Sequence, residues 1–474
     1  MSPVFRPVRE LAEAIRTRQI SPVELAETFL DRLERLGPHY NAVVTVTRDR
    51  ALGQARRAEE EITAGRWRGL LHGIPYGAKD LLATAGGIPT TWGAAPFRGQ
   101  TFDYDATVVE RLEAAGAVLV AKLAMVELAG GMGYRQPNAS FTGPGISPWG
   151  VGAWSGGSSS GSGSAVAAGL VPFAIGSETW GSILSPAANC GVSGLRPTYG
   201  RVSRHGAMAL CWTLDKLGPL ALTADDCGIV LDSIAGPDPR DPTTATRPFH
   251  YDGGEERGRR FRFGVIRDVA ATAEDAVRDA FASSLEVLGT LGSVEEITLA
   301  DLPYEAITRT ILMAEAASAF EDLIESGGIA GLTAPEDRFT AYARDAILAK
   351  DYIRALRLRA LVVREADRVL SGLDALVAPG RPALASPLDR EFRSAARGNV
   401  ADGRHRQCRR SAGDLGAERL CRGGVAHKPA VHGPGLGREY GPGGRPGLAA
   451  RHRLASTPAE PTRVSPLSRR RGAA

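Results

Sequence analysis

Helical spacing of apolar residues is clearest near the start of the chain. Between Leu25 and Leu33 the apolar residues recur three to five positions apart, which places them on one face of a helix. The helix is predicted to begin at Ser21, because the run SPVE supplies an N-cap serine, a proline at the first helical position and a glutamate at the third. Gly37 is predicted to end it.

Farther along, short apolar runs alternate with helical patterns. The stretch GIPYGAKD at 73–80 is predicted to be a strand end and a loop. Helices are predicted over Val108–Ala115 and Ala276–Leu288. Strands are predicted over Val118–Ala121, Val171–Ile175, Val265–Ile266, Ile297–Leu299 and Leu376–Ala378. Strands that alternate with helices predict an α/β fold with a parallel or mixed sheet.

The pattern is lost near residue 400. Residues 404–474 contain no Ile, Phe, Met or Trp, are rich in Arg, Gly, Pro and Ala, and show no helical or strand period. Such a segment cannot bury enough apolar area to offset the entropy lost on ordering. We therefore expect one domain over 1–400 and a disordered tail over 401–474.

The charge follows the same division. The net charge of +4 arises in residues 401–474, which hold 15 Lys and Arg against 5 Asp and Glu, so that residues 1–400 sum to −6. The body therefore lacks the basic surface that a nucleic acid needs, and no such partner is expected.

Cysteine usage and hydropathy exclude other classes. The five cysteines are scattered without C-x-x-C spacing, which argues against a disulfide framework and a zinc site. The chain has no run of 18 apolar residues, and its first residues lack the apolar stretch of a signal peptide. We expect no membrane span, no metal, and a reducing cytoplasm as the compartment.

Four explanations compete for the Gly/Ser-rich stretch that begins at Trp154. A flexible linker is disfavoured because the stretch runs straight into Ala-rich residues and an apolar strand. A phosphate-binding loop is disfavoured because no Gly-Lys-Ser/Thr ending is present. A nucleophile elbow matches Gly157–Gly161 formally, but it lacks a preceding strand, and His205 and His250 are the only downstream histidines before the tail.

The fourth explanation is a Ser–Ser–Lys amidase, because the stretch resembles the signature of the amidase signature family. The matching residues are Gly156–Ser160, Gly176–Glu178, Gly181–Ile183, Pro186–Ala187, Cys190–Gly191 and Gly194–Thr198. Other segments match the family in the expected order: Gly73–Pro75 with Ala78–Asp80, Asp105–Ala117, Lys122–Gly133 and Thr213–Pro219. The resemblance covers about residues 5–400 and is densest over 70–235.

The resemblance implies a single large α/β domain with a mixed central sheet flanked by helices, and hydrolysis of a small-molecule amide without a cofactor. It assigns Ser182 as the nucleophile, Ser158, in a cis peptide, as the bridge, and Lys79 as the base. The family's spacing of 24 residues before Ser182 selects Ser158 for the bridge. Backbone N–H groups of Thr179, Trp180, Gly181 and Ser182 would form the oxyanion hole. A homodimer is a further expectation.

Three departures and a rival function qualify this prediction. Trp180 replaces the family's usual glycine, and Leu184 replaces an arginine of many members, which disfavours a charged substrate. The tail stands where the family has its last strand and helix, and a frameshift near residue 400 would produce such a tail. If the tail is genuine, the chain is alternatively a catalytically dead homologue. The rival is the glutaminase A subunit of an aminoacyl-tRNA amidotransferase, which shares the relay.

Overall fold

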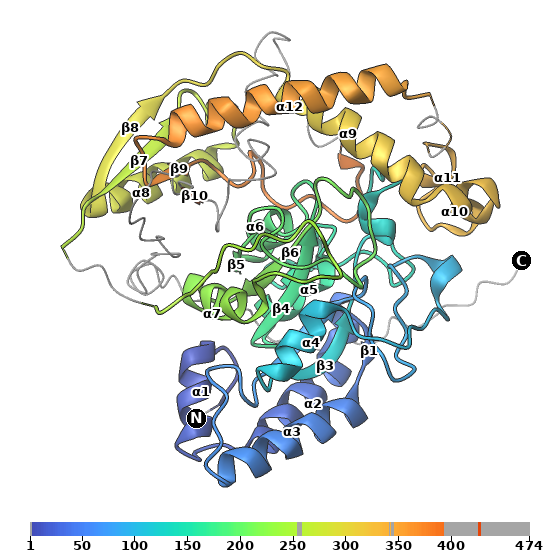
Figure 1. The fold of residues 1–474 in the computed structure, drawn as a ribbon, viewed down its shortest axis with the longest axis vertical. Helices are drawn as coiled ribbons and strands as arrows, with labels where there is room; N and C mark the ends of the chain where they lie inside the picture. Colours follow the sequence, from blue (N-terminus) through green and yellow to red (C-terminus); the bar gives the residue numbers. More distant parts are fainter. Residues whose placement is uncertain (1, 254–257, 341, 343–345, 393–424, 428–474) are drawn as a thin grey trace, which may run out of the picture.

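The computed structural model describes residues 2–253, 258–340, 342, 346–392 and 425–427 (Figure 1). The first half contains these elements: α1 (Val8–Arg16), α2 (Pro22–Tyr40), β1 (Val43–Val46), α3 (Arg48–Thr63), β2 (Pro75–Lys79), η1 (Ala95–Phe97), α4 (Thr107–Ala114), β3 (Val118–Leu123), η2 (Glu127–Gly130), α5 (Ser160–Ala167), β4 (Phe173–Glu178), α6 (Leu184–Cys190), β5 (Ser193–Gly194), β6 (Lys216–Ala221) and α7 (Ala224–Ile234). The second half contains β7 (Phe261–Ile266), α8 (Asp275–Leu291), β8 (Gly292–Ile297), α9 (Tyr304–Ala319), α10 (Glu321–Glu325), η3 (Gly328–Gly331), α11 (Asp337–Thr340), α12 (Ala349–Leu370), β9 (Ala375–Val377) and β10 (Val425–His427).

The strands of the first half form a mixed sheet in the order β1-β3-β2-β4-β6-β5. Strands β2, β3 and β4 are parallel, and β1 and β6 run antiparallel to their neighbours. At the start of β3, successive side chains point to opposite faces of the sheet and so join two different hydrophobic cores. Leu119 lies in a core with residues of α1 and α4, whereas Val118 and Val120 lie in a core with residues of α2, α3 and α5. The predicted mixed α/β sheet flanked by helices is therefore confirmed.

Within the described residues a second sheet, in the order β10-β9-β7-β8, lies apart from the first, and the long helix α12 passes over it toward α9 (Figure 1). The sequence predicted strands here but not that they would form their own sheet. The strand predicted at Ile297–Leu299 is misplaced, since β8 ends at Ile297. Because β8 is an edge strand, most residues of β8 are polar or exposed. The apolar residues that suggested a strand therefore lie at and beyond its carboxyl end.

Helix α2 confirms the predicted start and corrects the predicted end. Ser21 and Glu24 form the expected capping box. The helix does not stop at Gly37 but continues to Tyr40 and ends where Asn41 takes a left-handed conformation, with φ of 47°. Gly37 serves packing instead, because a Cβ there would lie 2.7 Å from Val43 Cγ2.

The remaining predicted elements agree with the structure to within a few residues, and GIPYGAKD contains the buried strand β2. In the described part of the chain, no helix combines the length and apolar character needed to cross a bilayer. The predicted tail lies outside the described residues except for β10, which pairs antiparallel with β9.

Candidate active site

The site forms at the carboxyl ends of two neighbouring parallel strands. Lys79 is the last residue of β2, and Ser177 lies near the end of β4. The pairing of Ala78 with Ile175 fixes the register between these strands, and the stacked rings of Tyr76 and Phe173 pack below. Because parallel strands end at the same edge of a sheet, Lys79 and Ser177 meet there.

Lys79 is fully buried among three serine hydroxyls. Its Nζ lies 2.8 Å from Ser158 Oγ, 3.0 Å from Ser159 Oγ and 2.9 Å from Ser177 Oγ. Ser158 and Ser159 lead into α5, and the peptide bond between Gly157 and Ser158 is cis. The structure therefore brings together two of the three residues predicted for the relay.

The hydroxyls of Ser159 and Ser158 differ in where their protons can go. Ser159 Oγ donates to the carbonyl of Ser177 over 3.2 Å, so its proton already has an acceptor other than the lysine. Ser158 Oγ has no such acceptor among the described residues, and its hydrogen bond is with Lys79. A neutral amine has a lone pair, so Lys79 can accept a proton from Ser158.

Burial also favours a neutral Lys79. It lowers the pKa of Lys79 to about 7, although the negative charges of Asp215 and Glu178 act in the opposite direction. A large fraction of the amine is therefore uncharged near neutral pH, as a base requires.

Ser182 lies in the loop between β4 and α6, which we call the Ser182 loop (residues 179–183). Its carbonyl accepts a hydrogen bond from the Ser159 N–H over 3.1 Å, which ties this loop to the start of α5. Ser182 as a whole is 7% exposed. Among the described residues no hydrogen bond joins the Ser158 and Ser182 hydroxyls, and such contacts commonly tighten only when substrate binds.

A buried ionic cluster holds the Ser182 loop from behind. Glu178 Oε2 accepts the N–H groups of Ile183 and Leu184 over 2.8 and 3.0 Å, while its other oxygen pairs with Arg196. Burial opposes ionisation of Glu178, but Arg196, Lys216 and these amides keep its pKa below the usual value. The carboxylate thus fixes the first turn of α6 just after Ser182.

The residues predicted for the oxyanion hole lie at the start of the same loop. Two hydrogen bonds hold Thr179 in place. Its hydroxyl donates to Asp215 Oδ1 over 2.5 Å, and its carbonyl accepts from Lys216 Nζ over 3.1 Å. Gly181 has φ of 85°, a conformation that favours glycine. Trp180 is half-buried, and the guanidinium of Arg309 on α9 lies 5.6 Å from its ring centroid.

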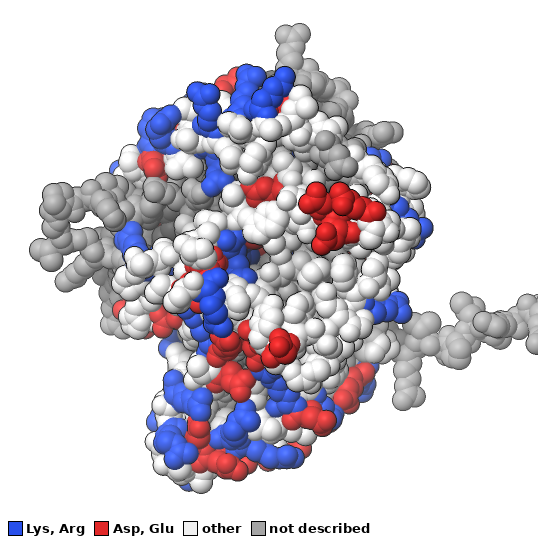
Figure 2. All heavy atoms as spheres, turned by 45° about the vertical axis from the view of Figure 1, so that its right-hand side comes forward, with Lys and Arg blue, Asp and Glu red and all other residues white. Residues whose placement is uncertain are grey.

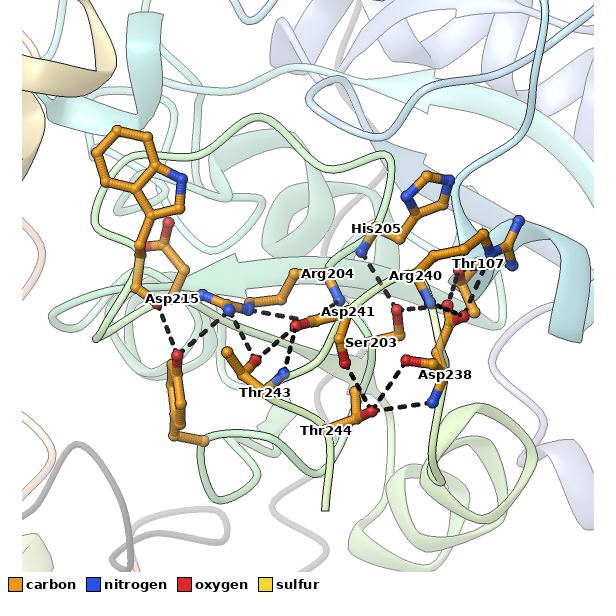
Figure 3. A network of polar contacts seen from close by, with 12 residues as sticks. Thr107, Ser203, Arg204, His205, Asp215, Asp238, Arg240, Asp241, Thr243 and Thr244 are labelled. Atoms are coloured by element: carbon orange, nitrogen blue, oxygen red, sulfur yellow. Dashed lines mark hydrogen bonds and ion pairs between the residues drawn. The ribbon is translucent and has the colours of Figure 1, made fainter. Parts of the chain in front are cut away.

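The histidines considered as alternative bases lie in other surroundings. In Figure 3 the backbone N–H of His205 points at Ser203, in a network that Asp238 organises with Thr107 and Arg240, while its ring points away from the carboxylates. That ring stacks on Tyr104. His250 is largely exposed beside Asp232. The described contacts of both histidines are with these residues, not with Ser158 or Ser182.

Sequence reasoning assigned no role to Ser177, Glu178 or Lys216. Ser177 and Glu178 belong to the matched motif and directly precede the Ser182 loop, and this position could have indicated a role for them in the site. The residues around Lys216 in the sequence gave no indication of its role. Lys216 reaches Thr179 only because β6 pairs with β4 in the sheet.

A family model described as Amidase matches residues 24–401 of the chain. Among curated proteins, the A subunit of the glutamyl-tRNA(Gln) amidotransferase from Anaeromyxobacter dehalogenans (strain 2CP-C) is 38% identical over 412 residues, covering 80% of this chain and 82% of the relative.

Two solved structures share the fold. The native peptide amidase from Stenotrophomonas maltophilia superposes with a TM-score of 0.70 at 32% identity, covering 82% of this chain and 86% of that one. A chain from a vestigial protein complex that reveals the evolutionary origins of an s-triazine catabolic enzyme gives a TM-score of 0.78 at 28% identity, covering 89% and 95%.

Proposed function

This chain belongs to the amidase signature family, and we propose that it hydrolyses a carboxylic amide to an acid and an amine or ammonia through an acyl-enzyme on Ser182. The observation that carries the proposal is the buried Lys79 amine, 2.8 Å from Ser158 Oγ, with its pKa near neutrality.

In the proposed reaction, Lys79 takes the proton of Ser158, and Ser158 takes the proton of Ser182 as Ser182 Oγ attacks the amide carbonyl. Backbone N–H groups of Thr179, Trp180, Gly181 and Ser182 stabilise the oxyanion. The C–N bond then breaks, and the relay returns the proton to the departing amine. Water attacks the resulting ester through the same relay, releasing the acid and restoring Ser182.

An activity-based fluorophosphonate probe tests the proposal directly. Covalent labelling of the wild type that Ser182→Ala abolishes is the expected result. Absence of labelling in a folded protein contradicts the proposal and favours the catalytically dead homologue.

The relative from the glutamyl-tRNA(Gln) amidotransferase supports a second candidate, a glutaminase that passes ammonia to a partner protein. Glutamine hydrolysis that appears only on addition of a co-purifying partner would favour it. Hydrolysis of other amides by the isolated chain, as a monomer or the expected homodimer, would favour the free amidase.

We further propose that the chain binds no nucleic acid and works in a reducing cytoplasm, and surface charge and free thiols support this proposal. On the face shown in Figure 2, basic and acidic side chains interleave over the lower part, where the N-terminal helices lie, which offers a phosphate backbone no continuous basic stripe. The described cysteines Cys190, Cys211 and Cys227 are free, as expected in a cytoplasm.

We also propose the division into an amidase domain over 1–400 and a tail over 401–474 that a frameshift produced. Mass spectrometry of the native protein, with re-sequencing of the gene near codon 400, tests this. A re-sequenced gene with this reading frame intact, together with native peptides that match residues 401–474, would end the frameshift hypothesis.

A further inference from the structure

The segment Leu210–Asp215, which we call the Asp215 loop, lies directly against the start of the Ser182 loop. Asp215 Oδ1 accepts the hydroxyl hydrogen of Thr179 over 2.5 Å. Its other oxygen, Oδ2, accepts the N–H groups of Leu210 and Cys211, both over 2.8 Å. Asp215 therefore closes its own loop and at the same time holds Thr179, the first residue of the Ser182 loop.

A second carboxylate holds the Asp215 loop from helix α9. Glu315 of α9 is buried, and its Oε2 accepts the Cys211 thiol over 3.0 Å and the Thr213 N–H over 2.9 Å. Its Oε1 accepts the Thr213 hydroxyl over 2.7 Å and the Tyr352 hydroxyl of α12 over 2.9 Å. These four bonds use the full accepting capacity of a carboxylate, and three of them hold the Asp215 loop.

Cys211 joins the two carboxylates. Its N–H donates to Asp215, and its thiol donates to Glu315. A continuous path of hydrogen bonds therefore runs from α9 through the Asp215 loop to Thr179. Hydrogen bonds to carboxylates are shorter and stronger than those between neutral groups, and neighbouring bonds in a buried network strengthen one another. A loss at Glu315 should consequently be felt at Thr179.

The Ser182 loop is held on both sides of its least constrained part. Behind it, Glu178 accepts two N–H groups at the start of α6. In front of it, Thr179 is held by Asp215. Between these anchors lies Gly181, whose φ of 85° is a conformation that glycine adopts without steric cost. The direction of the N–H groups in this part therefore depends on the anchors at either end.

We propose that Glu315 and Asp215 are positioning residues of the oxyanion hole, which together fix Thr179 so that its N–H stays directed at the developing negative charge. This inference rests on the proposed amidase function. Donors that are fixed before the reaction stabilise an oxyanion without reorganisation, and a misplacement of about 1 Å can cost on the order of 10²-fold in rate. Helix α9, from the second half of the chain, thereby controls turnover at a site that the first half builds.

The second-order rate constant of fluorophosphonate labelling tests the proposal without knowledge of the substrate. Phosphonylation of Ser182 places a phosphoryl oxygen in the oxyanion hole, so misplaced donors slow it. On the alkaline plateau, Glu315→Ala should be slowed by about 10- to 100-fold. Glu315→Gln should lose less, because an amide keeps one acceptor oxygen. Thr213→Val, which loses only the hydroxyl bond, should be slowed by a smaller factor and provides the test if Glu315→Ala does not fold.

The pH dependence of labelling separates positioning from a change in the base. Among the described residues, the charges that act on Lys79 are those of Asp215 and Glu178, and both raise its pKa against the effect of burial. Glu315→Ala should therefore lower the plateau and leave the acid limb near pH 7. Asp215→Ala should lower the plateau and also move the limb to lower pH, because removal of a negative charge lowers the pKa of Lys79 further.

Asp226→Ala is the matched control, because Asp226 is a buried carboxylate that accepts the N–H groups of Val8 and Thr223. It should lower the thermal unfolding midpoint but leave the plateau and the limb unchanged. Plateau rates of Glu315→Ala and Thr213→Val equal to that of the control would overturn the inference with the amidase function intact. A limb that moves in Glu315→Ala would overturn it too, since the loss would then arise at Lys79. A wild type without labelling would overturn the amidase function and this inference with it.

Discussion

The amine of Lys79 lies 2.8 Å from the hydroxyl of Ser158, and both side chains are almost completely closed off from solvent. A lysine in water is charged and cannot accept a proton at neutral pH. The burial at the end of β2 lowers the pKa of Lys79 to about 7 and so makes this contact a route for proton transfer.

Replacing Ser182 with Ala should reduce kcat/KM by about 10³-fold or more, because no other group is placed to form the acyl intermediate. The change should leave the thermal unfolding midpoint nearly unaltered, since only one hydroxyl is removed. Ser284→Ala, at an exposed serine of α8, is the control. Activity of Ser182→Ala close to that of the control would rule out the assigned nucleophile.

Ser158→Ala and Lys79→Ala should each cost heavily, whereas the double variant should be little worse than the poorer single variant. Groups that act on one proton path are non-additive. The measurement is a double-mutant cycle in kcat/KM on one neutral amide. Penalties that multiply would mean that the two residues do not share a path.

The kcat/KM of the wild type should fall below about pH 7 and reach a plateau above it. The reason is that acidification protonates Lys79, whose pKa is about 7, and a protonated amine cannot serve as the base. In Lys79→Ala this acid limb should be absent from the residual activity. A limb that persists unchanged would identify another group, such as His205, as the base.

Replacing Glu178 with Ala should destabilise the fold by about 3–5 kcal/mol, because it leaves buried Arg196 without this partner and removes the acceptor of two loop amides. Urea unfolding measures the loss, and kcat should fall as well, since the first turn after Ser182 is no longer held. Glu13→Ala is the control, because Glu13 pairs with Arg16 at the surface and should matter little. Equal stability of the two variants would contradict the role of the cluster.

Replacing Trp180 with Gly, the family's usual residue, should raise kcat/KM for amides with bulky acyl groups relative to small ones. The indole belongs to one of the residues predicted to supply an oxyanion donor, so we expect its removal to enlarge the space next to the acyl carbon. A panel of aliphatic amides of increasing size measures this ratio. An unchanged ratio would place the indole outside the acyl pocket.

The local sequence determined the features that depend on neighbouring residues. Ser21 and Glu24 indicated the start of α2 because a capping box is complete within four residues. The order and spacing of Lys79, Ser158 and Ser182 identified the candidate relay, because a family signature preserves the chemistry of a site as a pattern along the chain. By contrast, the edge strand β8 was misplaced because its polar, exposed residues carry no alternating signal.

Only the tertiary structure decided how the site is tuned. Lys79 loses its charge near neutral pH because sheet and helices surround it, a property of the packed core that its sequence neighbours do not encode. The ion pair of Glu178 and Arg196 joins the end of β4 to the segment that follows β5. Arg381 meets Ser185 across 196 positions of sequence. Contacts of this kind depend on how distant segments pack, and no local period or motif records them.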